Sequence, residues 1–464
     1  MRKNLLLLVA LFSFTAISYA QDHKHGNWCK TDEVYNKAYN EDPATFKAIE
    51  RQLDEAVVAY SNTASKMDDG RTFYIPVVFH YVHPVSQEGE RFFTRAMAEA
   101  TVRRLNEDFN RNNFDSFQIQ TYYKFWRRGN ARIKFVIAQI DPDGEATNGV
   151  NYYATDLAET ANRNGNDDII KYHTYSVGKF WSPDNYLNFW CVESISQPAG
   201  TQGEILAYAT LPEFEAFGAT RKTQSGVIAK RAVFMENITG KFQRHTLSHE
   251  VGHWLGLRHP FQTDEKSIQE LNEETQEYEP TGCNEGDCKF KGDKICDIPQ
   301  AYGQFLACSA NINSCPNETP IDNTTNIMDY RNCPEMFSRD QCIRMRGTLL
   351  SFRTEIVSWE NLQRVGINDK IVTDIKGKTS VYPNPFSDKI IVEVEMQRDV
   401  TACIEIRDLL GRSAYKDCKK KLHAGINKVE INANDMNLSS NGVYLVEIKM
   451  EDAVIVHKLQ YNGK

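Results

Sequence analysis

Three histidines and a glutamate in the middle of the chain have the spacing of metal ligands and a general base. His249, Glu250 and His253 form an HExxH pattern, and His259 follows six residues after the second histidine. Positions four residues apart lie on one face of a helix, so His249 and His253 can present their imidazoles to one ion. Gly256 allows the positive φ at which a helix ends, and the chain can then return His259 as a third nitrogen ligand.

Three imidazoles around a zinc ion leave one tetrahedral position, in which a catalytic zinc holds water. The ion would acidify this water and polarise the carbonyl group of a peptide bond. Glu250 follows the first ligand directly, so it could accept a proton from the water and pass it to the leaving amine. The pattern predicts a zinc-dependent peptide hydrolase. A zinc-bearing binding protein with a degenerate site is the competing interpretation, and such a protein would be expected to lose Glu250 first.

A second element follows further along the chain. The segment Asn326–Tyr330, which reads NIMDY, resembles the Met-turn that underlies the zinc in metzincin proteases. With the segment around the histidines, it makes the chain similar to the pappalysin family of metzincin endopeptidases, and the resemblance extends over residues 72–350. It implies that Met328 supports the zinc site and that Tyr330 steadies the oxyanion of the tetrahedral intermediate. A packed aromatic is the alternative role for Tyr330.

The order of the strand-like and helical patterns predicts an α/β catalytic domain. Runs rich in β-branched and aromatic residues predict strands at Tyr74–Val82, Ile133–Ile140, Tyr186–Ile195 and Ser225–Phe234. Apolar residues at helical spacing predict helices at Pro43–Tyr60, Thr94–Phe109 and Lys241–Leu257. The family resemblance implies a metzincin-like arrangement of these parts, in which a twisted sheet and an active-site helix lie above an irregular lower lobe.

The composition is that of a globular protein with an export signal. The 464 residues include 62 acidic and 54 basic side chains, for a formal net charge of −8, which argues against a nucleic-acid partner. Basic residues, a short apolar run and a small-residue cleavage site predict a signal peptide at residues 1–20. No later stretch is long and apolar enough to cross a bilayer, so we expect no transmembrane anchor.

Changes in composition and in predicted secondary structure divide the chain after the signal peptide into four parts. The expected parts are a latency pro-segment at 21–71, a zinc metalloprotease catalytic domain at 72–366, a linker at 367–378 and a small all-β sandwich at 379–464. Activation would follow cleavage between Lys66 and Arg71, just before the first strand of the catalytic domain.

Three motifs in the last 85 or so residues resemble the type A C-terminal sorting domain of Bacteroidetes type IX secretion substrates. They are Val381–Pro385, Asp408–Arg412 and Gly442–Val446. The resemblance implies export to the periplasm, passage across the outer membrane by the type IX secretion machinery, and an extracellular or cell-surface location. An accessory binding sandwich, for example for carbohydrate, is the alternative.

Eleven cysteines are distributed so that one is left over. Eight lie in the catalytic region and two in the terminal sandwich, which leaves Cys29 in the pro-segment. A thiolate is a good zinc ligand, so Cys29 could occupy the fourth coordination position in a latent precursor, as in related pro-enzymes. Asp32 is the alternative ligand.

The family resemblance also implies disulfides and calcium in the irregular lobe. By spacing, we pair Cys288 with Cys315 and Cys308 with Cys333, although sequence alone does not fix connectivity. The loop containing Asp293 and Asp297 resembles the family stretch GDxxxDTP that helps hold structural calcium, and carboxylate oxygens suit that ion. A polar turn without metal is the alternative.

One acidic residue beyond the Met-turn is a candidate for setting the substrate preference. The resemblance implies cleavage of protein or peptide substrates, with a possible preference for Arg or Lys on the primed side set by an acidic residue beyond the Met-turn. Glu335 could fill this role, and a solvated surface glutamate is the alternative.

Overall fold

The computed structural model describes residues 28–64, 72–87, 92–116, 119–126, 128–155, 169–196, 204–215, 222–235, 241–262, 288–289, 292–301, 312–315, 321–331, 333, 335–367, 375–396, 399–423, 425–438, 441–450 and 454–463. The expected signal peptide and the region between Lys66 and Arg71 lie outside these ranges. No helix in the described part of the chain has the length and apolar character needed to cross a membrane.

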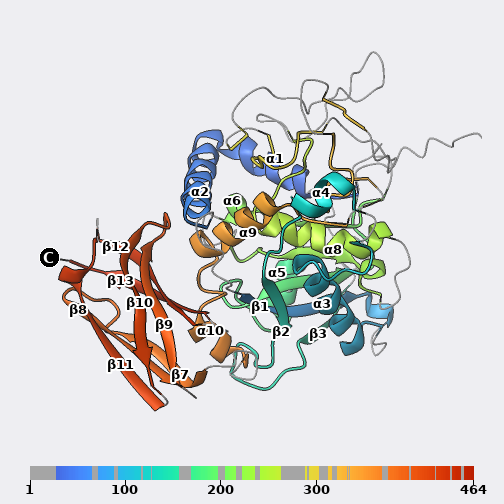
Figure 1. Cartoon of the computed structure of the whole chain (residues 1–464). Helices are drawn as coiled ribbons and strands as arrows, with labels where there is room; N and C mark the ends of the chain where they lie inside the picture. The colour runs from blue at the N-terminus through green and yellow to red at the C-terminus, as the bar shows by residue number, and fades with distance from the viewer. Residues whose placement is uncertain are drawn as a thin grey trace, which may run out of the picture.

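A six-stranded mixed sheet forms the centre of the catalytic part (Figure 1). Its strands are β1 (Phe73–His83), β2 (Ile133–Ile137), β3 (Val150–Ala154), β4 (Leu187–Val192), β5 (Ala207–Ala209) and β6 (Val227–Lys230). β1 pairs in parallel with β4, and β2 and β3 pair with the two halves of β1. β6 continues the sheet in parallel beyond β4, and β5 closes it as an antiparallel edge strand.

The predicted strands are present with different ends, and two strands were not predicted. The strand expected at Ser225–Phe234 is β6 followed by the 3-10 helix η5 (Arg231–Phe234), and the one expected at Ile133–Ile140 ends at Ile137. β5 was missed because it has only three residues, too few to show an alternating pattern. β3 was missed as well.

The sheet is accompanied by helices of very different lengths. They are α3 (Arg95–Phe109), α4 (Thr121–Trp126), α5 (Ile169–Val177), α6 (Pro212–Glu215), α8 (Lys241–Trp254), α9 (Arg339–Ser351), α10 (Trp359–Arg364) and the 3-10 helix η1 (Val85–Gln87). α8 contacts β5, β6 and α3, and its Leu247, Val251 and Trp254 are buried in the core, as their shared face predicts. This packing fixes α8, the helix that carries the HExxH pattern.

A buried histidine joins α3 to α8 one turn before the first predicted zinc ligand. Nδ1 of His245 lies 2.9 Å from a carboxylate oxygen of Asp108, and its Nε2 lies 2.9 Å from one of Asp115. Burial opposes protonation, but the two carboxylates outweigh it and raise the pKa of His245 to about 9. The start of α8 is therefore held to α3 by a charged contact inside the core.

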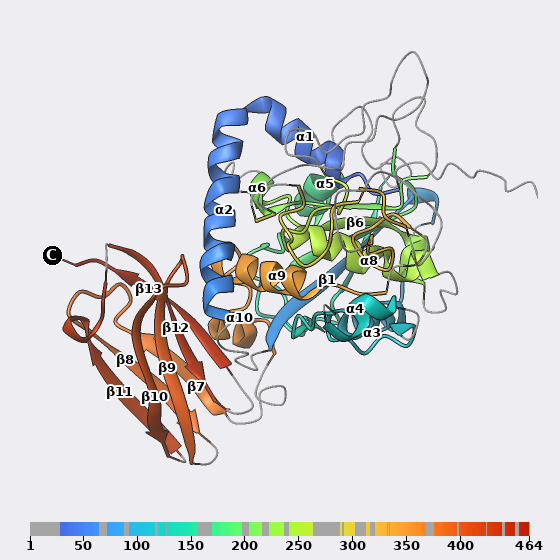
Figure 2. The ribbon, with the colours of Figure 1, turned by 45° about the horizontal axis from the view of Figure 1, so that its top comes forward.

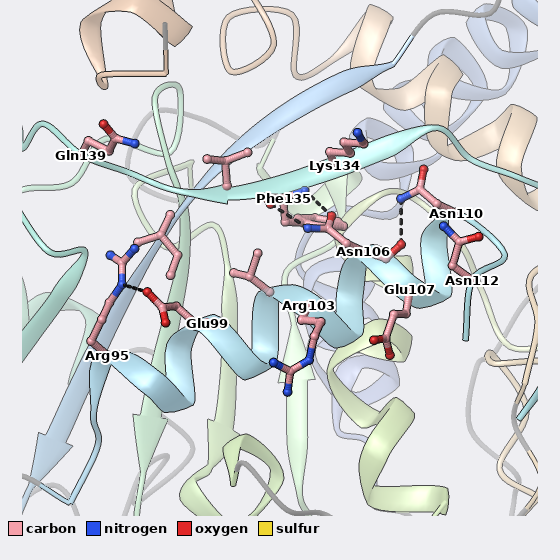
Figure 3. A pocket seen from close by; sticks show the side chains of 13 residues that line it. Arg95, Glu99, Arg103, Asn106, Glu107, Asn110, Asn112, Lys134, Phe135 and Gln139 are labelled. Atoms are coloured by element: carbon pink, nitrogen blue, oxygen red, sulfur yellow. Dashed lines mark hydrogen bonds and ion pairs between the residues drawn. The ribbon is translucent and has the colours of Figure 1, made fainter. Parts of the chain in front are cut away.

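Side chains of α3 cover the outer edge of β2 (Figure 3). Asn106 accepts from the Phe135 backbone N at 2.7 Å and donates to the Phe135 carbonyl at 3.0 Å, and Asn110 donates to the Ile133 carbonyl at 2.8 Å. An open hollow of about 560 Å³ beside these amides is lined by charges of both signs and contains none of the predicted site residues.

The pro-segment forms two helices, not the single one predicted. α1 (Thr31–Glu41) precedes α2 (Pro43–Ala64), which runs beside α9 along the outside of the catalytic part (Figure 2). Phe46 and Leu53 of α2 are completely buried. The pro-segment is thus packed onto the catalytic part through an apolar face of its own.

The C-terminal part is the expected all-β sandwich. Its strands are β7 (Ile375–Tyr382), β8 (Lys389–Met396), β9 (Val400–Asp408), β10 (Ser413–Leu422), β11 (Gly425–Asn432), β12 (Gly442–Lys449) and β13 (Val454–Tyr461), and η6 (Ala433–Asp435) is a 3-10 turn. A four-stranded sheet, β10-β9-β12-β13, faces a three-stranded one, β11-β8-β7. β7 begins at Ile375, so the sandwich starts inside the linker expected at 367–378.

Candidate active site

The three predicted histidine ligands converge on one point. The Nε2 atoms of His249, His253 and His259 lie 3.0 to 3.2 Å from one another, and each side chain is at most 1% exposed. Nitrogen ligands at about 2.0–2.1 Å from a tetrahedral zinc would be roughly 3.3–3.4 Å apart. The donor set and its spacing therefore fit zinc.

The other ring nitrogen of each histidine is held by a neighbour. Nδ1 of His249 lies 2.7 Å from the Ile327 carbonyl, and Nδ1 of His253 lies 2.9 Å from the Leu257 carbonyl. A proton on Nδ1 leaves the Nε2 lone pair available to a metal. Burial, followed by repulsion from the neighbouring histidines, lowers the pKa of both His249 and His253 well below its usual value, so both imidazoles are neutral, as metal ligation requires.

The end of α8 explains how His259 returns to the site. Gly256 has φ +84°. The Gly256 N donates to the His253 carbonyl at 2.8 Å, and the Leu257 N donates to the Gly252 carbonyl at 2.9 Å, which together make a Schellman cap. This turn places the Leu257 carbonyl against His253 and reverses the chain toward His259, as the sequence predicts for Gly256.

The Met-turn lies directly against α8. A Cβ atom on Gly252 would be 2.5 Å from the sulfur of Met328, so the helix has room for the methionine only because position 252 is glycine. Asn326 accepts from the Met328 N at 2.9 Å, and the next carbonyl, of Ile327, is the one that holds His249. The structure thus brings Met328 beneath the histidines.

The pro-segment enters the site next to strand β5. Cys29 pairs with Ala207 in a parallel bridge, the Leu206 N donates to the Trp28 carbonyl at 2.8 Å, and the Lys30 N donates to the Ala207 carbonyl at 3.1 Å. The Cys29 sulfur and one ligand atom from each of the three histidines all lie within 4.8 Å of one another.

Asp32 lies beside the cluster formed by Cys29 and the three histidines, and it is not part of that cluster. Its carboxylate is 2.9 Å from Nδ1 of His259, the nitrogen that faces away from the Nε2 triangle. Of the two side chains considered for the fourth zinc position, only Cys29 belongs to the ligand-like cluster among the described residues. Asp32 instead orients one of the histidines.

Glu250 is completely buried beside the same pro-segment residues. One of its carboxylate oxygens accepts from the Thr31 hydroxyl at 3.1 Å, and the same hydroxyl accepts from the Ala209 N at 2.9 Å. Burial, with a smaller contribution from the nearby Asp32 charge, raises the pKa of Glu250 to about 8. The predicted general base is thus capped by Thr31, a residue that no sequence pattern singles out.

Tyr330 is part of the same cluster. Its hydroxyl donates to the Cys29 carbonyl at 3.3 Å, and its ring centroid lies 4.6 Å from that of His259 and 5.2 Å from that of Trp28. The side chain packs against aromatic rings and points its hydroxyl at a carbonyl oxygen next to the histidines, and its role toward an oxyanion stays a prediction.

The predicted calcium loop holds one deeply buried carboxylate. Asp293 is 2% exposed, and its Oδ1 accepts from the Ile295 N at 3.0 Å. Its Oδ2 has no hydrogen-bond partner among the described residues, and burial raises the pKa of Asp293 well above its usual value. Asp297 accepts from the Asp340 N at 3.0 Å. A buried oxygen without a partner is compatible with a cation ligand.

The cysteine pairing predicted from spacing is wrong at Cys288. This residue forms a disulfide with Cys296, eight residues away, and not with Cys315. Cys315 and Cys333 are each disulfide-bonded, and Cys308 lies outside the described residues, so the pairing of Cys308 with Cys333 stays a prediction. Cys403 pairs with Cys418.

An even number of cysteines did not mean that all were paired. Cys191 and Cys342, counted in the even set of the catalytic region, are free and buried, as is Cys29. Burial raises the pKa of Cys191 and Cys342, which makes them small apolar core residues.

Glu335 is a buried residue, which rules out the solvated surface alternative. It is 1% exposed, its backbone N donates to the Thr325 carbonyl at 2.8 Å, and its own carbonyl accepts from Asn113 at 2.8 Å. Its charge acts on Arg128. The described contacts place it on the side of the Met-turn that faces Asn113 and Arg128.

Known proteins resemble both parts of the chain. Residues 171–350 match the family described as pregnancy-associated plasma protein-A, and residues 380–462 match the secretion system C-terminal sorting domain. An extracellular metalloprotease of Pyricularia oryzae is 25% identical over 301 residues, covering 64% of this chain and 82% of that protein. One of Sordaria macrospora is 32% identical over 111 residues, 24% of this chain and 31% of that protein.

A solved structure shares the fold. A promirolysin variant of Tannerella forsythia is 23% identical, with a TM-score of 0.52, over 71% of this chain and 97% of that one. Two histidines on a helix packed against this sheet, a third just after the helix end, and a Met-turn beneath them form the site of a metalloprotease of the metzincin type. Residues 171–350 thus match a metalloendopeptidase domain of the pappalysin family, and residues 380–462 match a type IX sorting domain, which supports secretion.

The cap at Gly256 gives a direct test of how the helix end holds the metal site. In Gly256→Ala the new Cβ would meet the Thr348 hydroxyl at 2.8 Å at a φ that alanine avoids, so the Leu257 carbonyl must move away from His253. We expect zinc affinity, measured by competition with a chelator, to fall roughly ten- to a hundredfold.

Gly144→Ala is the matched control for this substitution. Gly144 has φ +88° with no atom within 4 Å of a new Cβ, so the backbone strain is the same and the zinc site is untouched. Equal zinc affinities for the two variants would show that the helix end does not orient His253.

Proposed function

We propose that this chain is a latent precursor of a zinc endopeptidase that hydrolyses peptide bonds once its pro-segment leaves the histidine site. The observation that carries the proposal is the cluster of Cys29 with the three histidines. The groups needed for hydrolysis are assembled around this point, and in the precursor each one contacts a pro-segment residue.

His249, His253 and His259 would hold the ion through Nε2, with Cys29 as the fourth ligand in the precursor. Zinc in this site supplies a Lewis acid that polarises a carbonyl group and lowers the pKa of water. Glu250 would accept the proton of the attacking water and deliver it to the leaving nitrogen.

Tyr330 would stabilise the oxyanion. In the precursor its hydroxyl donates to a main-chain carbonyl oxygen, that of Cys29. In a substrate complex a carbonyl oxygen would take the same place, and the hydrogen bond would strengthen as negative charge develops on that oxygen.

Latency would follow from direct occupation of the site. Cys29 takes the ligand position, the Thr31 hydroxyl donates to Glu250, and the Trp28 ring lies 4.5 Å from that of His249. Pairing with Ala207 places this segment along β5, where a substrate chain would otherwise add to the sheet. Cleavage between Lys66 and Arg71 would separate the pro-segment from the catalytic part.

Export would use both ends of the chain. The signal peptide at residues 1–20 would direct it to the periplasm, and the sorting domain would engage the type IX machinery for passage across the outer membrane. The mature enzyme would act outside the cell on protein or peptide substrates, with Arg or Lys favoured on the primed side. Glu335 remains the candidate for that preference.

Calcium is proposed as a structural ion at Asp293 and Asp297. The Asp293 oxygen without a hydrogen-bond partner supports this assignment. Removal of calcium with EGTA, at free zinc held constant, should lower the unfolding temperature of the catalytic part, and Asp293→Asn should abolish that difference. An unfolding temperature that does not respond to EGTA would favour the polar turn without metal.

The hydrolytic role of Glu250 is tested by comparing the chain with Glu250→Ala, each activated by limited tryptic digestion. The parent should cleave a quenched peptide library, and a zinc chelator should stop it. The variant should bind zinc equally and lose nearly all turnover, because the carboxylate that would accept the proton of the attacking water is removed. Cleavage sites in the library report the primed-side residue, and cleavage by both proteins would contradict the assignment.

The ligand role of Cys29 is tested in the uncleaved precursor. Cys29→Ala should hydrolyse a peptide substrate more than about tenfold faster than the parent, since losing even about 1.4 kcal/mol of pro-segment binding shifts its occupancy tenfold. Cys191→Ala removes another buried free thiol outside the cluster and should stay latent. A Cys29→Ala precursor as silent as the parent would remove the cysteine from the mechanism of latency.

A further inference from the structure

Three buried cations of the catalytic part meet beneath α2. Arg258 follows the histidine helix, Lys294 lies in the loop after Asp293, and Arg344 is on α9; their side chains are 2%, 6% and 2% exposed. They come from three separate segments, and α2 lies against α9, the helix that carries Arg344 (Figure 2). Buried cations require anionic partners.

Two carboxylates of α2, one helical turn apart, supply those partners. Glu50 accepts from Arg258 and, at 3.0 Å, from Lys294. Asp54 accepts from Lys294 and from both terminal nitrogens of Arg344 at 3.0 Å. Because positions 50 and 54 face the same way on the helix, both side chains enter the cluster together.

Pro-segment residues also cover the sides of this cluster. The Arg258 guanidinium lies 5.1 Å from the ring centroid of Tyr35, whose hydroxyl donates to Glu50 at 3.2 Å. The arrangement has the features of a built recognition site, with an aromatic face and two carboxylates bound to three cations.

Departure of the pro-segment leaves the cations without enough negative charge. Arg258 keeps Glu213 at 3.5 Å, and Arg344 keeps its bond to the Gly256 carbonyl at 2.6 Å. The two ion pairs that Lys294 makes within the described residues are both with α2. Asp293 is the other acid whose charge acts on Arg258 and Arg344, so two carboxylates remain beside three cations. The catalytic part therefore retains an excess of positive charge at this place.

We propose that Arg258, Lys294 and Arg344 form a carboxylate-binding site beside the active site, which activation uncovers and which takes a helical peptide carrying two acidic side chains one turn apart. α2 is the instance seated on it in the precursor. The site lets the released pro-segment bind again, and it gives acidic helices a point of attachment distinct from the histidines. This proposal rests on the proposed latency in one respect, because α2 must leave the catalytic part before the site can bind another helix.

The experiment measures binding of a labelled peptide of residues 43–64 by fluorescence anisotropy. The protein is the Glu250→Ala chain, cut by limited tryptic digestion before the first strand and freed of its pro-fragment in high salt. No hydrolysis by the chain is needed, so a failure of the proposed catalytic role does not affect this readout. We expect saturable binding that weakens as salt is raised.

Charge neutralisation on each side then tests the site. A peptide with Glu50→Gln and Asp54→Asn should bind at least about tenfold more weakly, and Lys294→Gln in the protein should have a similar effect. Lys222→Gln, which removes an exposed lysine paired with Asp184, should change nothing. In a double-mutant cycle, Lys294→Gln should reduce the difference in affinity between the acidic and the neutral peptide, while Arg258 and Arg344 maintain the rest of it.

Three results would overturn the proposal: no binding of the acidic peptide, equal binding of the neutral one, or equal binding by Lys294→Gln and Lys222→Gln. Lys294→Arg keeps the charge and should restore binding, which separates a charge effect from misfolding. The peptide substitutions need no altered protein, so the test stays decisive even where Lys294→Gln does not fold.

Discussion

The site depends on one constraint: three imidazoles must be buried with their Nε2 atoms about one point. Each ring is held there through its opposite nitrogen, by the Ile327 carbonyl, the Leu257 carbonyl and Asp32. Three other features help to hold the rings in place. They are the positive φ at the end of α8, the glycine that receives the Met-turn sulfur, and the charged contact that holds the start of the helix to α3. Small backbone features thus control where the metal ligands lie.

The central part of the site could be predicted because its information is local. The i, i+4 spacing of His249 and His253 and the glycine before His259 describe a helix and its end, which follow from backbone geometry. The apolar runs identified four strands of the sheet for the same reason. Their ends were misplaced where a strand changes into a 3-10 helix, because side-chain pattern alone does not show where hydrogen-bond pairing stops.

The remainder depends on contacts between residues far apart in the chain. Thr31 meets Glu250 across 219 residues, and Asp54 meets Arg344 across 290, so no local pattern identifies either pair. The error at Cys288 is of the opposite kind. A long-range pairing was predicted across the irregular lobe, but the disulfide joins Cys288 to Cys296, only eight residues away. Counting cysteines also missed that Cys191 and Cys342 serve as apolar core residues.

The short edge strand β5 limits how a guest chain can be held. With three residues, it offers only a few main-chain hydrogen bonds, and in the precursor Trp28 and Lys30 already use those of Leu206 and Ala207. Main-chain hydrogen bonds do not depend on side-chain identity. An edge strand this short would therefore contribute the same small binding free energy for every extended peptide. Discrimination among the segments that pair with β5 would therefore depend on side-chain contacts and on surfaces beyond this strand.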